Sequence, residues 1–315
     1  MKHPLLSRFK GGLLGSYLGE VLGKSCRKSI FNPNRFNLSP RNLTSWSIVS
    51  TCALESLISY GSLNCKGWLE RIRFRAPSIL ELEKTVTNSE LAIATLPIAL
   101  FFHETRYLQR ANLRKSLDIW VGESCDHSNN LAWGHILHLI LKEKLHPVNL
   151  IPQAIGYFQE KGMETPLVRQ LQQVETFISQ STPLQKVTAH LSRQGHKSYT
   201  PIALAYYCFL TTPEDFRLAL TRAVQTSYYP TLTGALTGAL AGAYNGTSSI
   251  PCQWLLMTKK NPLAQKIALL TTQLFATWSG VQQPNSNQNL LDIAAVASSG
   301  IIQPRSQLRI ISQEE

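Results

Sequence analysis

The sequence PEDFRLALTRAVQTSYYPTLTGALTGALAGAYNGTSSIP, residues 213–251, predicts the helix around which the chain is organised. In its second half glycine recurs every fourth residue, at Gly234, Gly238, Gly242 and Gly246, with alanines beside them. A helix face that carries nothing larger than a methyl group lets a neighbouring backbone approach closely. We therefore expect a central, tightly packed helix. It is not expected to cross a membrane, because no purely apolar run of about 20 residues is present.

The segment RFKGGLLGSYLGEVLG, residues 8–23, predicts a helix of the same kind near the start of the chain. Its leucines, together with Tyr17 and Val21, recur at the three- and four-residue spacing of a buried helical face. Its glycines again permit close packing; they are Gly11, Gly12, Gly15 and Gly19. We expect this helix to be buried as well.

Length and composition indicate one large helical body. Of the 315 residues, 43% are hydrophobic and 16% are charged, which is enough to bury a sizeable core. Helical periodicity runs through most of the chain, whereas strand-like alternation is nearly absent. We predict an all-α fold, with a single compact multi-helix domain over residues 1–280. Residues 281–315 are predicted to form a polar C-terminal extension that holds a short helix and is partly flexible.

Positive charge is concentrated near the start of the chain. The formal net charge is +12, and residues 2–41 contain eight Lys or Arg against Glu20 alone. This segment either binds an anionic partner, such as a nucleotide, nucleic acid or acidic protein, or is a solvated basic loop. Nucleic acid is the less favoured partner, because no RNP-type, finger or helix-turn-helix signature accompanies the charge.

The cysteines and the N-terminus favour a cytoplasmic protein. Six cysteines are scattered without a CxxC pair or metal-finger spacing, as expected for reduced thiols. No apolar stretch precedes Arg8 and Lys10, so neither a signal peptide nor a membrane anchor is predicted.

Several short segments occur in an order shared with a known family. They are the opening segment 8–23, Ser56-Leu57, Pro213-Glu214-Asp215-Phe216, Gly238-Ala239-Leu240-Ala241-Gly242-Ala243-Tyr244 and Ile250-Pro251. In this order they resemble the signatures of the ADP-ribosylglycohydrolases, including the dinitrogenase-reductase-activating glycohydrolases. The resemblance implies the helical fold of that family. As an activity, it implies hydrolytic release of ADP-ribose from modified protein side chains.

The resemblance also implies a pair of Mg or Mn ions held by aspartates of two motifs, TDDT and DTDT. In this chain the first motif falls on Thr44-Ser45-Trp46-Ser47 and the second on Tyr229-Pro230-Thr231-Leu232, so both pairs of aspartates are replaced. Glu20 occupies the acidic position of the opening helix. Two divalent ions need several anionic oxygen ligands, which hydroxyls and indoles do not supply. We therefore predict no binuclear centre, no metal ligand and no catalytic residue.

The same positions are candidates for a ligand-binding cleft, formed by Glu20, Thr44, Ser45, Trp46, Ser47, Tyr228, Tyr229 and Thr231. Their aromatic rings could stack on the adenine of an ADP-ribose-like nucleotide, while the hydroxyls offer polar contacts. Alternatively, the rings fill the vacated metal cavity as ordinary core, and the bound partner is then a protein.

Other polar residues carry weaker indications of function. Asn88 and Pro97 match part of a further family element. Asp126 and His127 resemble the family's Thr-His helix start, and His135 and His138 share a helix face, but no further acidic or Cys ligand lies at matching spacing. Satisfied or solvent-facing histidines are the favoured interpretation.

Three functions are compatible with this sequence. The first is a catalytically degenerate member of the family that acts by binding or regulation and has a protein partner, for which an acidic surface is one option. The second is an active hydrolase that removes ADP-ribose from modified side chains. The third is a basic-surface binder of nucleic acid or of an acidic protein, whose binding should weaken strongly with salt.

Overall fold

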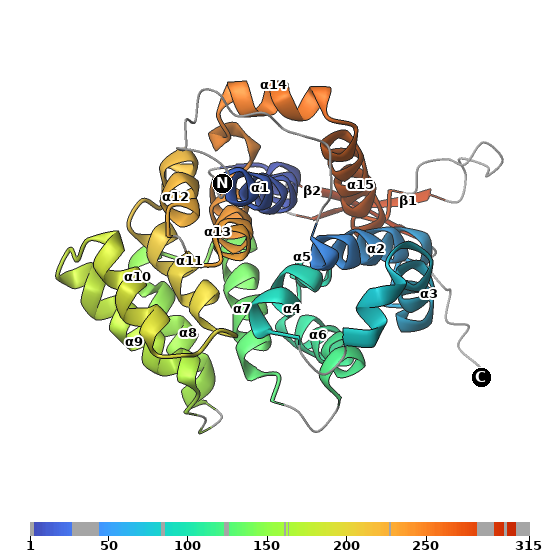
Figure 1. The fold of residues 1–315 in the computed structure, drawn as a ribbon. Helices are drawn as coiled ribbons and strands as arrows, with labels where there is room; N and C mark the ends of the chain where they lie inside the picture. Colours follow the sequence, from blue (N-terminus) through green and yellow to red (C-terminus); the bar gives the residue numbers. More distant parts are fainter. Residues whose placement is uncertain are drawn as a thin grey trace.

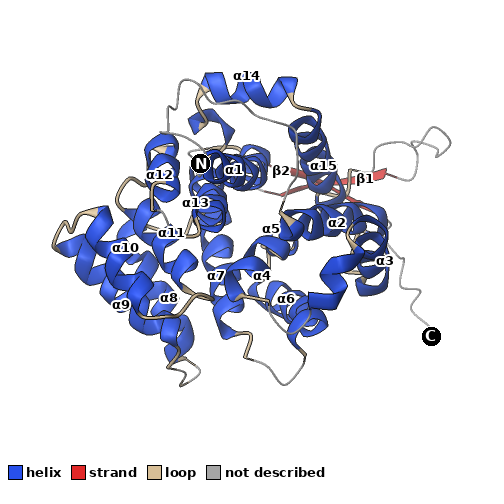
Figure 2. Cartoon of the chain, viewed as in Figure 1, coloured by secondary structure: helices blue, strands red, loops and turns tan. Residues whose placement is uncertain are grey.

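A computed structural model describes residues 3–26, 44–82, 86–122, 126–160, 162, 164–226, 228–281, 293–298 and 301–306. The helices at the start are α1 (Leu5–Cys26), α2 (Ser45–Tyr60), α3 (Cys65–Arg75), α4 (Asn88–Ala94), α5 (Leu96–Phe101), α6 (Arg106–Val121) and α7 (Ser128–Leu141). They are followed by α8 (Leu150–Gln159), α9 (Pro166–Ser179), α10 (Leu184–Arg193), α11 (Thr200–Leu210), α12 (Phe216–Val224), α13 (Pro230–Asn245), α14 (Cys252–Lys260) and α15 (Pro262–Trp278). Short 3-10 turns are η1 (Pro77–Leu82), η2 (Pro147–Asn149) and η3 (Thr247–Ser249). The predicted all-α fold is confirmed (Figures 1 and 2).

The two glycine-rich helices predicted from the sequence pack against each other. In Figure 1, α1 and α13 lie side by side and the other helices surround them. Gly15 faces Gly238 and Gly19 faces Gly234, so closely that a Cβ atom added at Gly234 would lie 2.5 Å from the carbonyl oxygen of Gly19. Because real Cβ atoms do not approach a carbonyl oxygen this closely, the pair depends on glycine at these positions.

A buried arginine ties α1 to two further helices. Arg8 donates hydrogen bonds to the carbonyl oxygens of Ala243 (3.2 Å), Leu141 (3.2 Å) and Ile140, and it pairs with Glu143 at 3.1 Å. The carbonyls at the end of α7 have no partner within their own helix, and the guanidinium group supplies one. Arg8 therefore fixes the C-terminal end of α7 against α1 and α13.

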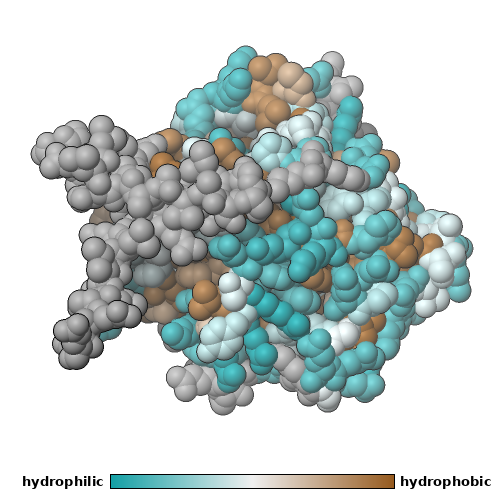
Figure 3. Space-filling view, turned by 180° about the vertical axis from the view of Figure 1, so that it is seen from behind, coloured by the Kyte–Doolittle hydropathy of each residue, from teal (hydrophilic) through white to brown (hydrophobic). Residues whose placement is uncertain are grey.

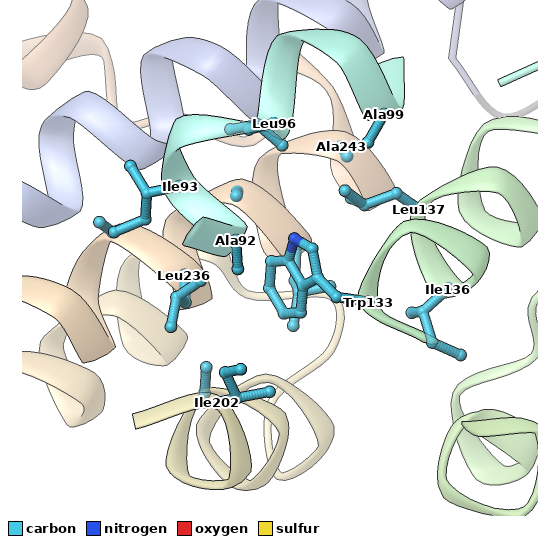
Figure 4. Packing of buried hydrophobic residues seen from close by; sticks show 14 of the residues in the cluster. Ala92, Ile93, Leu96, Ala99, Trp133, Ile136, Leu137, Ile202, Leu236 and Ala243 are labelled. Atoms are coloured by element: carbon cyan, nitrogen blue, oxygen red, sulfur yellow. The ribbon is translucent and has the colours of Figure 1, made fainter. Parts of the chain in front are cut away.

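The core continues from this pair outward through the middle of the molecule. Figure 4 shows Trp133 of α7 between Ala92 of α4, Ile202 of α11 and Leu236 of α13. These apolar side chains recur at helical spacing, which is why the segments form helices that each bury one face. On the side opposite the view of Figure 1, the surface is mainly polar, with separated apolar areas (Figure 3).

The described part of the C-terminal extension does not contain the predicted short helix. The described part of this segment forms two antiparallel strands, β1 (Ile293–Ser298) and β2 (Ile301–Ser306), with Ile293 opposite Ser306. β-branched Ile and Val favour extended backbone, and Pro304 would end a helix here. The predicted flexibility of the extension concerns residues outside those described, and its separation from a domain over residues 1–280 stays a prediction.

No helix in the described ranges combines the length and the apolar character needed to span a bilayer.

Candidate functional site

The candidate site lies where the end of α1 meets the start of α13. A Cβ atom added at Gly23 would lie 2.6 Å from the Cα atom of Thr231. One turn before Gly23, Glu20 is buried, with 1% of its surface exposed. The tight packing of the two helices thus brings the surviving acidic residue close to the segment that corresponds to the second family motif.

Both carboxylate oxygens of Glu20 already have partners. Oε1 accepts a hydrogen bond from the backbone N–H of Thr44 and pairs with Lys24 Nζ at 2.7 Å. Oε2 accepts a hydrogen bond from the hydroxyl of Ser47. A buried carboxylate is stable only when its charge and its lone pairs are satisfied, and these three groups do so.

The beginning of α2 explains why two of these partners are in place. Thr44 is the N-cap of α2, and its Oγ1 accepts a hydrogen bond from the backbone N–H of Ser47 at 3.4 Å. The two hydroxyl oxygens are 3.2 Å apart. An N-cap of this kind fixes the first turn, so the Thr44 backbone and the Ser47 side chain face Glu20 together. The structure therefore brings together three of the predicted site residues: Glu20, Thr44 and Ser47.

Trp46 points away from this cluster and belongs to the core. Only 5% of its surface is exposed, and its ring meets Trp120 of α6 edge to face at a centroid distance of 5.2 Å. Trp120 in turn contacts Trp68 of α3 at 5.9 Å. Of the two alternatives for this ring, the geometry supports core packing rather than stacking on a ligand. Its neighbour Ser45 is exposed to solvent.

The other predicted residues form a second group at the start of α13. Tyr228 and Tyr229 meet edge to face at 4.9 Å, and Tyr229, 37% exposed, has left-handed backbone angles of φ 44° and ψ 52°. Such angles are unfavourable for a residue with a Cβ atom. Burial, followed by the effect of Tyr229, raises the pKa of Tyr228. Thr231 is half-buried in the first turn of the helix.

A small cavity lies between α1, α2 and the helices behind them. It has a volume of about 30 Å³ and is lined by polar and apolar groups that include Ser16, Tyr17, Ser47 and Thr51. Such a space holds one or two water molecules rather than a nucleotide. Burial, and then the charge of Glu20, raise the pKa of Tyr17 to about 12.

Two polar features of the structure were not predicted from the sequence. One is Lys24, which follows Glu20 by four residues. This is the spacing of an ion pair along a helix, and it could have predicted the contact. The other is a polar network in which Ser198 accepts a hydrogen bond from the backbone of Asn88 at 2.8 Å and Asn130 donates to the Asn88 carbonyl oxygen at 2.8 Å. Of this network, the sequence pattern indicated Asn88 alone. The Oδ1 atom of Asn130 is buried without a partner among the described residues.

The histidines named from the sequence are engaged elsewhere. His127 contacts Asp118 at 2.6 Å, and Asp126 accepts hydrogen bonds from the backbone and hydroxyl of Ser128, both at 2.8 Å. His135 and His138 stack at 6.0 Å, and burial, followed by the charge of Arg106, lowers the pKa of His135 to about 4. Within the described ranges, no three His, Cys, Asp or Glu side chains come together as a metal-binding group.

The comparisons with known proteins agree with this geometry. The family model for ADP-ribosylglycohydrolase matches residues 1–284, so this chain belongs to the ADP-ribosylglycohydrolase family. A solved structure described as an ADP-ribosylglycohydrolase-related protein complex is similar with a TM-score of 0.63 and 19% sequence identity. The match covers 87% of this chain and 99% of that one, and at this identity it shows the shared fold. The search of curated proteins returned no match.

The described residues at the positions predicted for the family's metal motifs do not fit a pair of divalent ions. Members of the family are metal-dependent, but here Glu20 is the single carboxylate of the cluster and its oxygens hold Lys24, Thr44 and Ser47. An ammonium group beside the carboxylate opposes a second cation. Among the described residues, the predicted cleft consists of a polar cluster at Glu20 and a partly exposed tyrosine pair at α13.

Proposed function

We propose that this protein is a non-catalytic member of its family that acts by binding or regulation. The observation that carries the proposal is the pairing of Glu20 with Lys24. A divalent ion bound at this carboxylate would need its oxygens as ligands, whereas here the ammonium group of Lys24 already pairs with Oε1. Opening the pair to admit a metal ion would leave Lys24 next to it, which is electrostatically unfavourable.

The sequence around the site supports the same proposal independently of any alignment register. Residues 21–54 contain no Asp, Glu or His, and residues 216–291 contain no Asp or Glu. A shift of several positions in either family motif therefore restores no carboxylate. The ligands that Mg²⁺ and Mn²⁺ prefer are absent from both segments that supply them in the family.

A protein partner fits the site better than a nucleotide. The cavity lined by Tyr17 and Ser47 has room for water only, and the ring of Trp46 packs against Trp120. The net charge of +12 favours a partner with an acidic surface. Such a partner would bind through the outer surface of the domain, with the family scaffold acting as a rigid support.

Two measurements on the purified chain test the proposal. Elemental analysis and titration with Mn²⁺ are expected to show no bound divalent ion, and incubation with ADP-ribosylated protein is expected to release no ADP-ribose. A metal-dependent relative, assayed in parallel, shows that the substrate is competent. Binding of two Mn²⁺ ions per chain together with Mn²⁺-dependent release of ADP-ribose would establish the alternative, an active hydrolase.

A further inference from the structure

The outward face of α6 carries cations around an exposed aromatic ring. Tyr107 is 77% exposed, and Arg110, Arg114 and Lys115 are exposed as well. Tyr107, Arg110 and Arg114 are spaced by three and four residues, which places them along one side of the helix. We call these four residues the α6 face. They lie outside the Glu20 cluster and were not part of any site predicted from the sequence.

The cations of the α6 face are not neutralised within the described protein. Arg110, Arg114 and Lys115 form no ion pair with a described residue, and two acidic groups near the helix are already engaged. Glu160 pairs with Arg106 at 2.8 Å, and Asp118 contacts His127 at 2.6 Å. Surface cations that have no ion pair among the described residues are available to an external anion, since no such pair must be broken first.

Further cations are exposed on α6 and after the end of α7. The two helices pack against each other, with Arg106 exposed at the start of α6 and Lys142 and Lys144 exposed just beyond α7. Arg106 is also held over the ring of Tyr157 at 5.4 Å, which fixes this end of α6.

We propose that the α6 face binds single-stranded nucleic acid. Arg110, Arg114 and Lys115 contact phosphates, and the ring of Tyr107 stacks on a base. Arginines four residues apart on a helix are separated by about 6 Å along the axis, so one extended strand can contact successive side chains. The only other large apolar side chain exposed on α6 is Leu108, so the face lacks the apolar centre of a protein interface.

The experiment measures fluorescence anisotropy of a labelled oligothymidylate and a labelled oligouridylate with the full chain over a range of salt concentrations. We expect binding at low salt that weakens as salt rises, with a slope of roughly −0.7 in log–log form for each phosphate contacted. The double variant Arg110→Glu/Arg114→Glu should weaken binding by more than tenfold. Tyr107→Ala should weaken it about fivefold or more while leaving the salt slope unchanged, because stacking releases no counterions.

A matched control carries the same change of charge on a distant helix. Lys186→Glu/Arg193→Glu alters two exposed cations of α10, which lies on the other side of the molecule from α6 in Figure 1. This variant should lose at most a few-fold in affinity. The proposal is overturned if both double variants lose affinity equally, if neither oligonucleotide binds at low salt, or if polyglutamate binds more tightly than the oligonucleotides and Tyr107→Ala has no effect. Circular dichroism verifies that each variant is folded.

Discussion

The ammonium group of Lys24 lies 2.7 Å from Oε1 of Glu20, one helical turn earlier on α1. The carboxylate is buried at 1% exposure, whereas the lysine side chain is 34% exposed. A partly solvated cation thus neutralises a buried anion at low desolvation cost. This pair links the fold of the family to the binding function proposed for this chain.

Removing the cation should destabilise the fold. In Lys24→Met the buried carboxylate keeps the hydrogen bonds from Thr44 and Ser47 but loses its opposite charge. We expect a loss of about 1–2 kcal/mol in the free energy of unfolding, less than for a fully buried pair because Lys24 is partly exposed. Urea denaturation measures this. Lys10→Met, on the same helix, is the control, and an equal loss in both variants would contradict the role of the pair.

A methyl group in the glycine contact should be far more damaging than one on a free helix face. Gly15→Ala places its Cβ atom against the backbone of Gly238. We expect a loss of about 3 kcal/mol or more in the free energy of unfolding, because backbone on both sides must move. In Gly156→Ala of α8 the new methyl group meets no atom within 4 Å, so stability should stay equal or rise by up to about 1 kcal/mol. Thermal unfolding of the two variants measures this difference. Similar losses of stability in both would contradict the close packing.

The left-handed backbone of Tyr229 predicts that glycine is more stable than alanine at this position, which is the reverse of the usual order in a helix. Both Tyr229→Gly and Tyr229→Ala remove the ring contact with Tyr228, so their difference reports the backbone alone. At φ 44° the glycine variant should be more stable than the alanine variant by about 1 kcal/mol. In an ordinary helical position alanine is the more stable of the two. Equal stability, or a more stable alanine variant, in chemical denaturation would show that this residue is not strained.

Stability should fall as the medium becomes acidic, partly because of His135. Burial and Arg106 hold its pKa at about 4, below the value of about 6.5 expected in the unfolded chain. The contribution is therefore fully present above pH 6.5 and is lost as the pH falls from 6.5 toward 4, since the unfolded chain binds the proton first. His135→Phe keeps a ring against Tyr157 and should make the pH dependence of the unfolding free energy shallower in this range. In the control His146→Phe, at an exposed position, the pH dependence of the unfolding free energy should stay steeper than in His135→Phe.

Much of the fold could be predicted from local patterns. Glycines four residues apart in residues 234–246 and in the opening helix predict that another backbone packs closely against each helix. This prediction is confirmed for Gly15 and Gly238, whose backbones lie against each other. The extension could not be assigned this way, because Ile293 and Val296 are compatible with a short buried helix as well as a strand. Pairing with β2 decides between them, and pairing is a long-range contact.

The sequence by itself determined family membership and the helical class, since both depend on which residues occur and in what order. Only the tertiary structure decided what surrounds Glu20 and Trp46. Trp46 belongs to the core because Trp120 of α6 packs against its ring. The carboxylate of Glu20 has hydrogen-bond donors because α2 begins beside it. A sequence pattern gives the spacing of residues along one helix. Burial and charge compensation depend instead on neighbours that are distant in the sequence.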